Sequence, residues 1–154
     1  MKAKIKTEMD NWQAWNDLGV RARSEFLSAW AEKLTGKSAY MVKYQIKHGL
    51  SHIEEVKLMP GATGESNELY CSGRGIFAIH AEENCPIEAI VGMVASALLA
   101  GNCIALSLAD NAMNENIKTT LERAGLVDQV SEQPLLFGND HDLAGVAFVG
   151  SLEE

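Results

Sequence analysis

The chain has 154 residues, of which 47% are hydrophobic and 22% charged, and its formal net charge is −8. This length and composition predict one globular domain, residues 1–154, that buries its own core. The acidic balance argues against nucleic acid as a partner, because phosphate binding needs a concentrated cationic face. The longest apolar run, Ile87–Leu99, is shorter than the roughly 20 residues that span a bilayer, so we expect no membrane partner.

The cysteines and the N-terminal lysines bear on the compartment. Cys71, Cys85 and Cys103 are widely spaced, odd in number and form no Cys-x-x-Cys motif. We therefore expect reduced thiols in a cytoplasmic protein. The three lysines at positions 2, 4 and 6 lack a following apolar core, so we do not expect a signal peptide.

The N-terminal part shows helical periodicity. Apolar residues recur at helical spacing over 11–34, which predicts one amphipathic helix, weakened by Gly19 and ended by Gly36. A second helix is predicted to begin at a Ser38 cap and to end at Gly49.

Two histidines fall near the end of that second helix. His48 and His52 are four residues apart, a spacing that can place two imidazoles on one helix face. Gly49 is expected to end the helix between them, and no third ligand is evident. Because zinc sites use three or four protein ligands, we expect no metal site here.

A loop rich in Pro, Gly, Ser and Asn follows over 59–67. It lacks the Gly-Lys-Ser/Thr ending of a phosphate-binding P-loop and precedes a predicted strand at 68–72, not a helix. Turn geometry is therefore the better explanation of its glycines.

The segment from Gly75 to Asp110 organises the rest of the chain. We predict a strand at 76–79, a buried helix over 87–100 with Pro86 in its first turn, and a second strand at 103–106. These elements make a right-handed βαβ unit with parallel strands.

The C-terminal part continues the alternation. A helix capped by Asn111 or Asn114 is predicted to stop at Gly125. The short apolar runs 134–137 and 145–149 are predicted to be parallel strands buried on both faces.

The predicted fold class is α/β. Residues 59–154 read as an open, mostly parallel, Rossmann-like sheet, preceded by two amphipathic helices in residues 1–58. Ligands of such sheets bind beyond the carboxyl ends of the strands, here 80–84, 107–111 and 150–151. None of these ends carries the Gly-x-Gly-x-x-Gly of an ordinary dinucleotide fold.

Few residues at these ends suggest chemistry. Glu82 and Glu83 would repel a pyrophosphate, and as loop neighbours they fit a solvated turn better than a general acid/base pair. Cys85 lies where a helix dipole can activate a thiol, but no base is evident, so a structural thiol is expected. His80 and Ser107 could serve as base and nucleophile only if the fold brings them together, and the Gly-x-Ser-x-Gly elbow is absent.

Several short motifs occur in the order of a known family. The Asn-Cys-Pro of 84–86, the Ala-Leu-Leu-Ala-Gly-Asn of 97–102 and the Phe-Val-Gly-Ser of 148–151 resemble motifs of the aldehyde dehydrogenase superfamily. The Trp-rich, Arg-containing N-terminal helix is similar to the first helices of that superfamily. The Pro-Gly-Ala-Thr-Gly-Glu-Ser-Asn of 60–67 resembles a loop near the C-terminus of the proline utilisation A family, whose members oxidise proline through pyrroline-5-carboxylate to glutamate. The resemblance covers most of the chain.

The resemblance implies a truncated aldehyde-dehydrogenase-like fold and assigns roles to four positions. Asn84 matches the asparagine that stabilises the family's oxyanion. Gly150 and Ser151 match residues near the pyrophosphate of NAD, the family's cofactor, and Ser107 replaces the lysine that contacts its ribose. The family's catalytic cysteine and general-base glutamate come after the position of Ser151. We therefore expect this chain to lack them, and to bind no cofactor tightly.

The leading interpretation is a non-catalytic aldehyde-dehydrogenase-like domain with a structural or assembly role in proline catabolism. The alternative is an NAD-dependent pyrroline-5-carboxylate dehydrogenase-like oxidoreductase that needs a partner chain, and a third possibility is a degenerate product without a task. A homodimer is expected, because the strand at 145–149 leaves an unpaired sheet edge. The alternative is a monomer in which the N-terminal helices cover the open face of the sheet. Chains of proline-catabolic enzymes are further expected partners.

Overall fold

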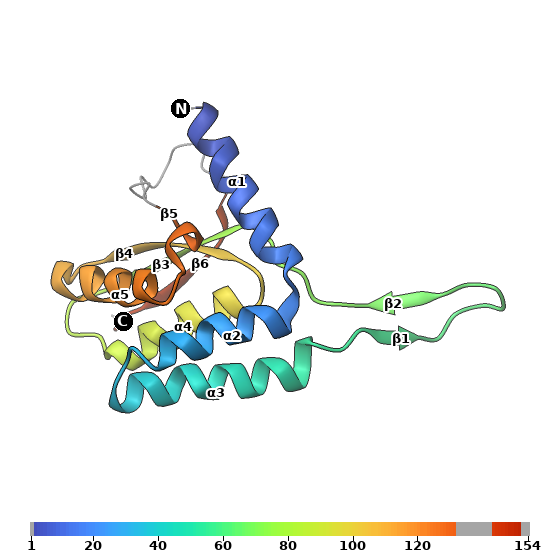
Figure 1. Cartoon of the computed structure of the whole chain (residues 1–154), viewed down its shortest axis with the longest axis horizontal. Coiled ribbons are helices and arrows are strands. Elements are labelled where there is room, and N and C mark those ends of the chain that lie inside the picture. The colour runs from blue at the N-terminus through green and yellow to red at the C-terminus, as the bar shows by residue number, and fades with distance from the viewer. Residues whose placement is uncertain (1, 132–142, 152–154) are drawn as a thin grey trace.

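A four-stranded parallel sheet forms the centre of the molecule in the computed structural model, which describes residues 2–131 and 143–151 and the side chains from residue 8 (Figure 1). The strand order is β5–β4–β3–β6, and all three pairings are parallel. The chain adds β4 and β5 on one side of β3 and then returns to add β6 on the other. The four strands are β3 (Ile76–Ala81), β4 (Cys103–Leu108), β5 (Val130–Ser131) and β6 (Leu143–Val149).

The predicted βαβ unit is confirmed. Helix α4 (Ile87–Leu99) connects β3 to β4, and its buried side chains include Ile90, Val94 and Leu98. Ala100 ends the helix, and Gly101 follows in the left-handed conformation, with φ of +91°. The apolar periodicity of the helix and the residues at its two ends were therefore enough to predict this unit from its own segment of the sequence.

Helix α5 (Asn111–Arg123) has a different cap from the predicted one. Asp110, not Asn111 or Asn114, is the N-cap, and its carboxylate accepts a hydrogen bond from the backbone N–H of Met113 at 3.0 Å. A carboxylate at this position also complements the helix dipole. Gly125 follows the helix with φ of +80°, as the predicted stop requires.

The predicted single helix over 11–34 is in fact two helices. Helix α1 (Lys2–Asp17) and helix α2 (Gly19–Ala31) meet at an angle (Figure 1). Gly19 has φ of +81°, outside the right-handed helical region, so at the junction the glycine breaks the helix and does not merely weaken it.

Helix α3 (Gly36–Ile53) runs through Gly49, where a helix end was predicted. A Cβ at Gly49 would collide with the side chain of Leu99 on α4, so the glycine allows the two helices to approach closely. The predicted cap is also wrong: Thr35 occupies the N-cap position, and Ser38 lies inside the first turn.

One buried cation joins three helices at the C-terminal end of α4. Arg23 is 2% exposed, and its guanidinium donates hydrogen bonds to the carbonyls of Leu99 at 3.0 Å and Asn16 at 2.7 Å. These carbonyls lie at the C-terminal ends of α4 and α1, where the helix dipoles favour a positive charge. Burial lowers the pKa of the Arg23 guanidinium, and the two helix ends compensate its charge in place of a carboxylate.

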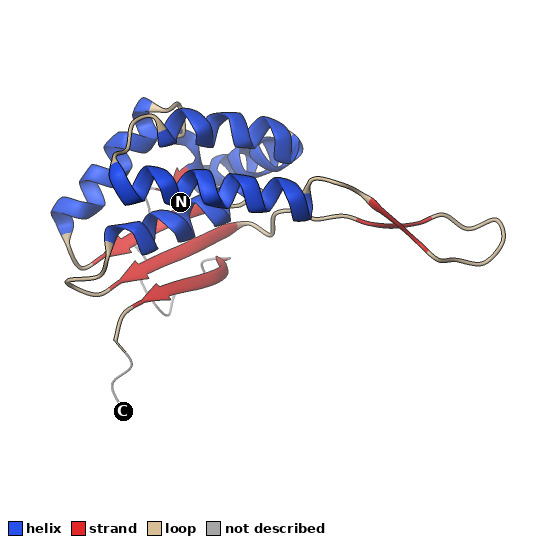
Figure 2. Cartoon of the chain, turned by 90° about the horizontal axis from the view of Figure 1, so that it is seen from below, coloured by secondary structure: helices blue, strands red, loops and turns tan. Residues whose placement is uncertain are grey.

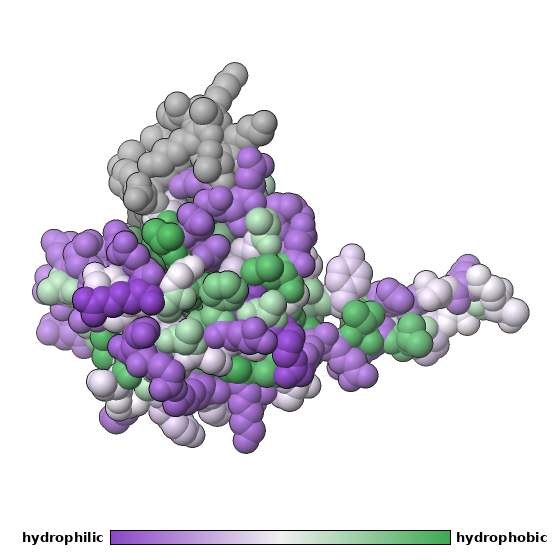
Figure 3. Space-filling model, in the orientation of Figure 1, coloured by the Kyte–Doolittle hydropathy of each residue, from purple (hydrophilic) through white to green (hydrophobic). Residues whose placement is uncertain are grey.

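A β-hairpin projects from this body, and we call it the arm (Figures 1 and 2). Strand β1 (Lys57–Met59), which was not predicted, pairs antiparallel with β2 (Asn67–Leu69), a shorter strand than the predicted 68–72. All six strand residues are exposed. Apolar side chains lie at its surface (Figure 3); they are Val56, Leu58, Met59, Leu69 and Tyr70.

Strand β6 is not buried on both faces as predicted. Val146 and Phe148 are 55% and 50% exposed. The physical reason is that β6 is an edge strand and that helices gather on one side of the sheet (Figure 2). The other predicted strand, 134–137, lies outside the described residues.

Candidate functional site

The switch point of the sheet lies between β3 and β6. From β3 the chain proceeds to β4 on one side, whereas β6 is added on the other side. Ligands of open α/β sheets bind in the crevice that forms where the strand order reverses. Here the loop after β3 and the residues after β6 line that crevice, so Asn84, Gly150 and Ser151 are all at its mouth.

Glu82 occupies the mouth. The backbone N–H of Ser151 donates to the Glu82 carboxylate at 3.0 Å, and the Ser151 hydroxyl donates to the same oxygen at 3.3 Å. A Cβ on Gly150 would lie 2.7 Å from this carboxylate, so glycine permits the close approach. Glu82 is exposed, as expected for a solvated residue, but its carboxylate also makes this specific contact. Its carboxylate binds the segment that resembles the family's pyrophosphate-binding motif.

The loop between β3 and α4 positions Asn84 and Cys85. Asn84 has φ of +63° and is the one non-glycine residue with a positive φ in the described part of the chain. The Cys85 thiol is half-buried and donates to the carbonyl of Val149 at 3.2 Å. This bond ties the loop to the end of β6, which fits the structural role expected for Cys85.

His80 and Ser107 occupy paired positions on β3 and β4, so their side chains share one face of the sheet. The His80 ring stacks on Phe148 of β6, with ring centroids 5.6 Å apart. The imidazole therefore packs against an aromatic ring of β6. The arrangement gives no support to a hydrolytic pair.

The histidines of α3 form part of a row of exposed rings. His48 lies between Tyr44 and His52, with ring centroids 4.2 Å and 6.1 Å away. A hydrogen bond of 2.7 Å joins His52 Nδ1 to the backbone carbonyl of His48. Within residues 2–131 and 143–151, no group of three or more His, Cys, Asp or Glu residues could hold a metal ion.

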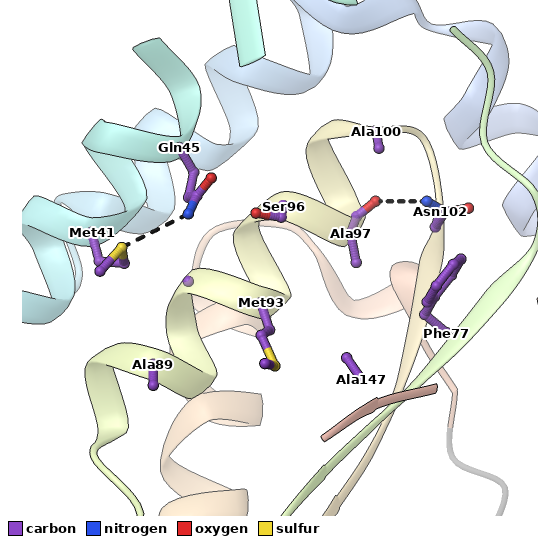
Figure 4. Close-up of a pocket in the computed structure, with 11 residues that line it drawn as sticks. Met41, Gln45, Phe77, Ala89, Met93, Ser96, Ala97, Ala100, Asn102 and Ala147 are labelled. Atoms are coloured by element: carbon purple, nitrogen blue, oxygen red, sulfur yellow. Dashed lines mark hydrogen bonds between the residues drawn. The ribbon is translucent and has the colours of Figure 1, made fainter. Parts of the chain in front are cut away.

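An apolar groove of about 460 Å³ runs beside α4 (Figure 4). Its floor is formed by Phe77 of β3 and Ala147 of β6, and Met41 and Gln45 of α3 line its far side. The α4 side is a strip of small residues with one methionine, and it comprises Ala89, Gly92, Met93, Ser96, Ala97 and Ala100. Sequence periodicity marked α4 as buried on most sides and so missed this open strip.

No protein-family model and no curated protein matches the chain. Solved structures do. The chain is 23% identical to a structure of proline utilization A with proline bound in remote sites, with a TM-score of 0.76 over 96% of this chain and 19% of that one. It is 17% identical to PnpE in complex with nicotinamide adenine dinucleotide, with a TM-score of 0.72 over 82% of this chain and 32% of that one.

A third similar structure is a Burkholderia cenocepacia protein provisionally named an aldehyde dehydrogenase, at 15% identity and a TM-score of 0.70, covering 82% of this chain and 32% of that one. The chain therefore has an aldehyde-dehydrogenase-like fold related to that of proline utilization A. It spans between about a fifth and a third of the length of these proteins. None of the helices in the described residues is long and apolar enough to cross a membrane.

Proposed function

We propose that this chain is a non-catalytic aldehyde-dehydrogenase-like domain with a structural or assembly role in cytoplasmic proline catabolism. The fold and the loop at 60–67 support the link to proline utilization A. One observation carries the non-catalytic role: the hydrogen bonds from Ser151 to Glu82 place a carboxylate in the mouth where a dinucleotide would bind.

The Glu82 carboxylate disfavours NAD in two ways. It already accepts the hydrogen bonds of the Ser151 N–H and hydroxyl, which a phosphate oxygen would otherwise accept. It also places a negative charge beside the anionic pyrophosphate, and like charges at close range repel. Ser107, at the position of the family's ribose-binding lysine, supplies no compensating cation.

Calorimetric titration with NAD tests this proposal. The unmodified chain is expected to show no micromolar binding and to produce no NADH from pyrroline-5-carboxylate. Glu82→Gln removes the charge at the mouth, and Glu83→Gln is the control. The Glu82→Gln chain should bind NAD about tenfold more tightly than the control, because a hydrogen bond to a charged group contributes at least a factor of about ten in affinity. Micromolar NAD binding by the unmodified chain would contradict the proposal.

The alternative function is that of an NAD-dependent pyrroline-5-carboxylate dehydrogenase-like chain that acts with a partner. The left-handed conformation of Asn84 favours it, because strained backbone is often retained at catalytic positions. The test is to mix the chain with a proline-catabolic enzyme chain that supplies the thiol. NADH formation that Asn84→Ala abolishes would establish this alternative.

For the assembly role, we propose a second copy of the chain as the partner of β6. The Val149 carbonyl accepts a hydrogen bond from the backbone N–H of Glu82, the residue that follows β3. The backbone N–H and C=O groups of alternate β6 residues therefore point toward β3. Val146 and Phe148 therefore direct their backbone groups to the open edge. Two copies related by a two-fold axis can pair these edges antiparallel, with Val146 opposite its own copy.

The surroundings of β6 suit a second copy. The strand, Leu-Ala-Gly-Val-Ala-Phe-Val, has no charge and no proline, so neither repulsion nor a missing N–H opposes pairing in this acidic chain. The apolar groove lies on one face of β6, and the exposed side chains of Val146 and Phe148 lie on the other. One two-fold contact would thus cover the edge and place the apolar side chains of the two copies beside one another.

Sedimentation equilibrium tests the dimer with a matched pair of variants. Val146→Lys places a charge at the centre of the proposed contact and should give a monomer of 16.7 kDa. Val127→Lys changes a valine of almost equal exposure, 54% against 55%, far from β6 and should leave the dimer intact. A monomer of the unmodified chain across the micromolar range would exclude this interface.

A further inference from the structure

A second cavity, of about 600 Å³, lies where the α2–α3 connection meets the beginning of α4 and the outer part of α5. Its lining includes Ile87, three residues after Asn84 of the mouth, but it shares no residue with the Glu82, Gly150 and Ser151 cluster. Most of its lining residues are polar and three are cations; the full lining comprises Lys33, Leu34, Thr35, Lys37, Ser38, Ile87, Glu88, Asn116, Thr120 and Arg123.

Three cations surround this cavity in a chain whose net charge is −8. Lys37 Nζ lies 3.6 Å from the carboxylate of Glu88, the one acidic residue of the lining. No ion pair joins Lys33 or Arg123 to a carboxylate in the described part of the chain. The cavity therefore has an excess of positive charge that the fold itself does not neutralise.

Two long helices begin at the cavity. Helix α3 has 18 residues and helix α4 has 13, and neither N-cap residue, Thr35 or Pro86, makes a side-chain capping bond. The first N–H groups of a helix have no intrahelical acceptor, and the helix dipole adds partial positive charge there. Such ends bind phosphate and carboxylate groups readily.

Ser38 provides an independent indication of a ligand. It is 8% exposed and lines the cavity, yet its hydroxyl makes no hydrogen bond with any described residue. The other buried serine, Ser24, donates to the carbonyl of Arg21 at 2.7 Å. Its hydroxyl oxygen is not fully enclosed by protein, so the Ser38 hydroxyl is open to the cavity, where a ligand can accept its hydrogen bond.

We propose that this cavity binds a small anion that carries a phosphate or carboxylate group. The anion would accept hydrogen bonds from the Ser38 hydroxyl and from the N–H groups at the start of α3. Lys33 and Arg123 would neutralise its charge. Glu88 opposes an anion and so limits the affinity, while its pair with Lys37 holds that cation at the rim.

Titration followed by backbone amide NMR tests the site, with inorganic phosphate in one series and succinate in the other. Saturable shifts are expected at the amides of Gly36, Lys37, Ser38 and Ile87 in at least one series. The anion with the higher affinity identifies the ligand class. No saturable shift with either anion, or shifts spread over the whole surface, would overturn the proposal.

Variants separate specific binding from general attraction to cations. Arg123→Gln should weaken binding about tenfold, as expected for a hydrogen bond to a charged group. Lys118→Gln is the matched control, because Lys118 is a cation of the same helix that pairs with Glu115 outside the cavity. Equal affinities of the two variants would refute the site.

The Ser38 and Glu88 variants test the remaining roles. Ser38→Ala removes only a hydroxyl and should lower the affinity several-fold without altering the fold. Glu88→Gln should raise the affinity, because it removes the opposing charge. The opposite result with Glu88→Gln, a lower affinity, would mean that the cavity does not select anions. None of these variants changes Glu82, Gly150 or Ser151 at the mouth, so a failure of this anion test is distinguishable from a failure of the NAD test.

Discussion

The two ends of helix α4 differ in how completely their backbone groups are hydrogen-bonded. At the C-terminal end, the carbonyls of Ala97, Leu98 and Leu99 accept side-chain bonds; the donors are Asn102, Trp15 and Arg23. At the N-terminal end, Pro86 makes no capping bond, and cations line a cavity. A helix end that the fold completes stabilises the protein, whereas one that the fold leaves open can bind a ligand. Mutations at the two ends should therefore separate stability from binding.

The largest effect is expected at the closed end. Arg23→Leu leaves the carbonyls of Asn16 and Leu99 without donors, and each buried acceptor left unsatisfied costs about 1–3 kcal/mol of the free energy of unfolding. Arg21→Leu is the control: its side chain is 68% exposed and pairs with Glu54 at the surface, so it should cost about 1 kcal/mol or less. Urea unfolding measures both, and equal losses would refute the role of Arg23.

Gly73 tests how tightly the closed end is packed. A Cβ at this position would collide with the backbone carbonyl of Gly101, which cannot rotate away as a side chain can. Gly73→Ala should therefore lower the free energy of unfolding by roughly 1–3 kcal/mol, the usual range for overpacking. The neighbouring change Ser72→Ala should cost less, since Ser72 is exposed. Anion binding at the open end should survive both changes.

Cys103, the first residue of β4 after the closed end, makes stability depend on pH. Burial, and to a lesser degree Glu8 and Asp128, raise the pKa of its thiol from 9.0 to about 12. Between these values the unfolded thiol loses its proton while the folded one retains it. The free energy of unfolding should thus fall by about 1.4 kcal/mol per pH unit above pH 9. The contribution is fully present below pH 9.

Denaturant unfolding between pH 8 and pH 10, the interval that brackets the ordinary thiol pKa of about 9, measures this slope. Cys103→Ala should remove it whatever its effect at neutral pH. Cys71→Ala, which changes an exposed thiol, should leave it unchanged. A slope that persists in Cys103→Ala would assign the dependence to another group.

The smallest effect on the free energy of unfolding is expected at the N-caps, where helix α5 has a side-chain capping bond and helix α3 has none. Asp110→Ala removes the bond to the N–H of Met113 and should cost about 1 kcal/mol of the free energy of unfolding. Thr35→Ala removes no such bond at the start of α3 and should cost less. If phosphate then stabilises the Thr35→Ala protein as much as the unmodified one, the anion is bound by backbone N–H groups and not by the threonine.

The features that the sequence predicted are those whose cause is local. The apolar run of α4 and the turn at Gly101 are adjacent in the chain, so the βαβ unit could be derived from them. Gly19 and Gly49 could not be distinguished, because one has a positive φ and the other accommodates Leu99 of a different helix. Neither property can be predicted from the residues that neighbour the glycine in the sequence.

The candidate sites were harder to predict for the same reason. Glu82 appeared to be a turn residue, because its partner Ser151 is 69 positions away. Arg23 joins carbonyls from two other helices, and no spacing rule marks such a residue. The basic cavity joins Lys33 and Ser38, which are close in sequence, with Arg123 from the far end of α5. Each of these arrangements follows from the packing of the helices and the sheet, which composition and periodicity do not specify.

The position of β6 has a consequence for the order in which the chain folds. Its partner β3 ends more than 60 residues earlier, and β4, α5 and β5 all intervene. Contacts of such high sequence separation form slowly, because the chain must close a long loop first. During synthesis, the β6 side of β3 therefore stays open until β6 emerges, and an open apolar edge is where nascent chains aggregate. We expect the yield of folded protein, more than its final stability, to depend on how quickly β6 docks.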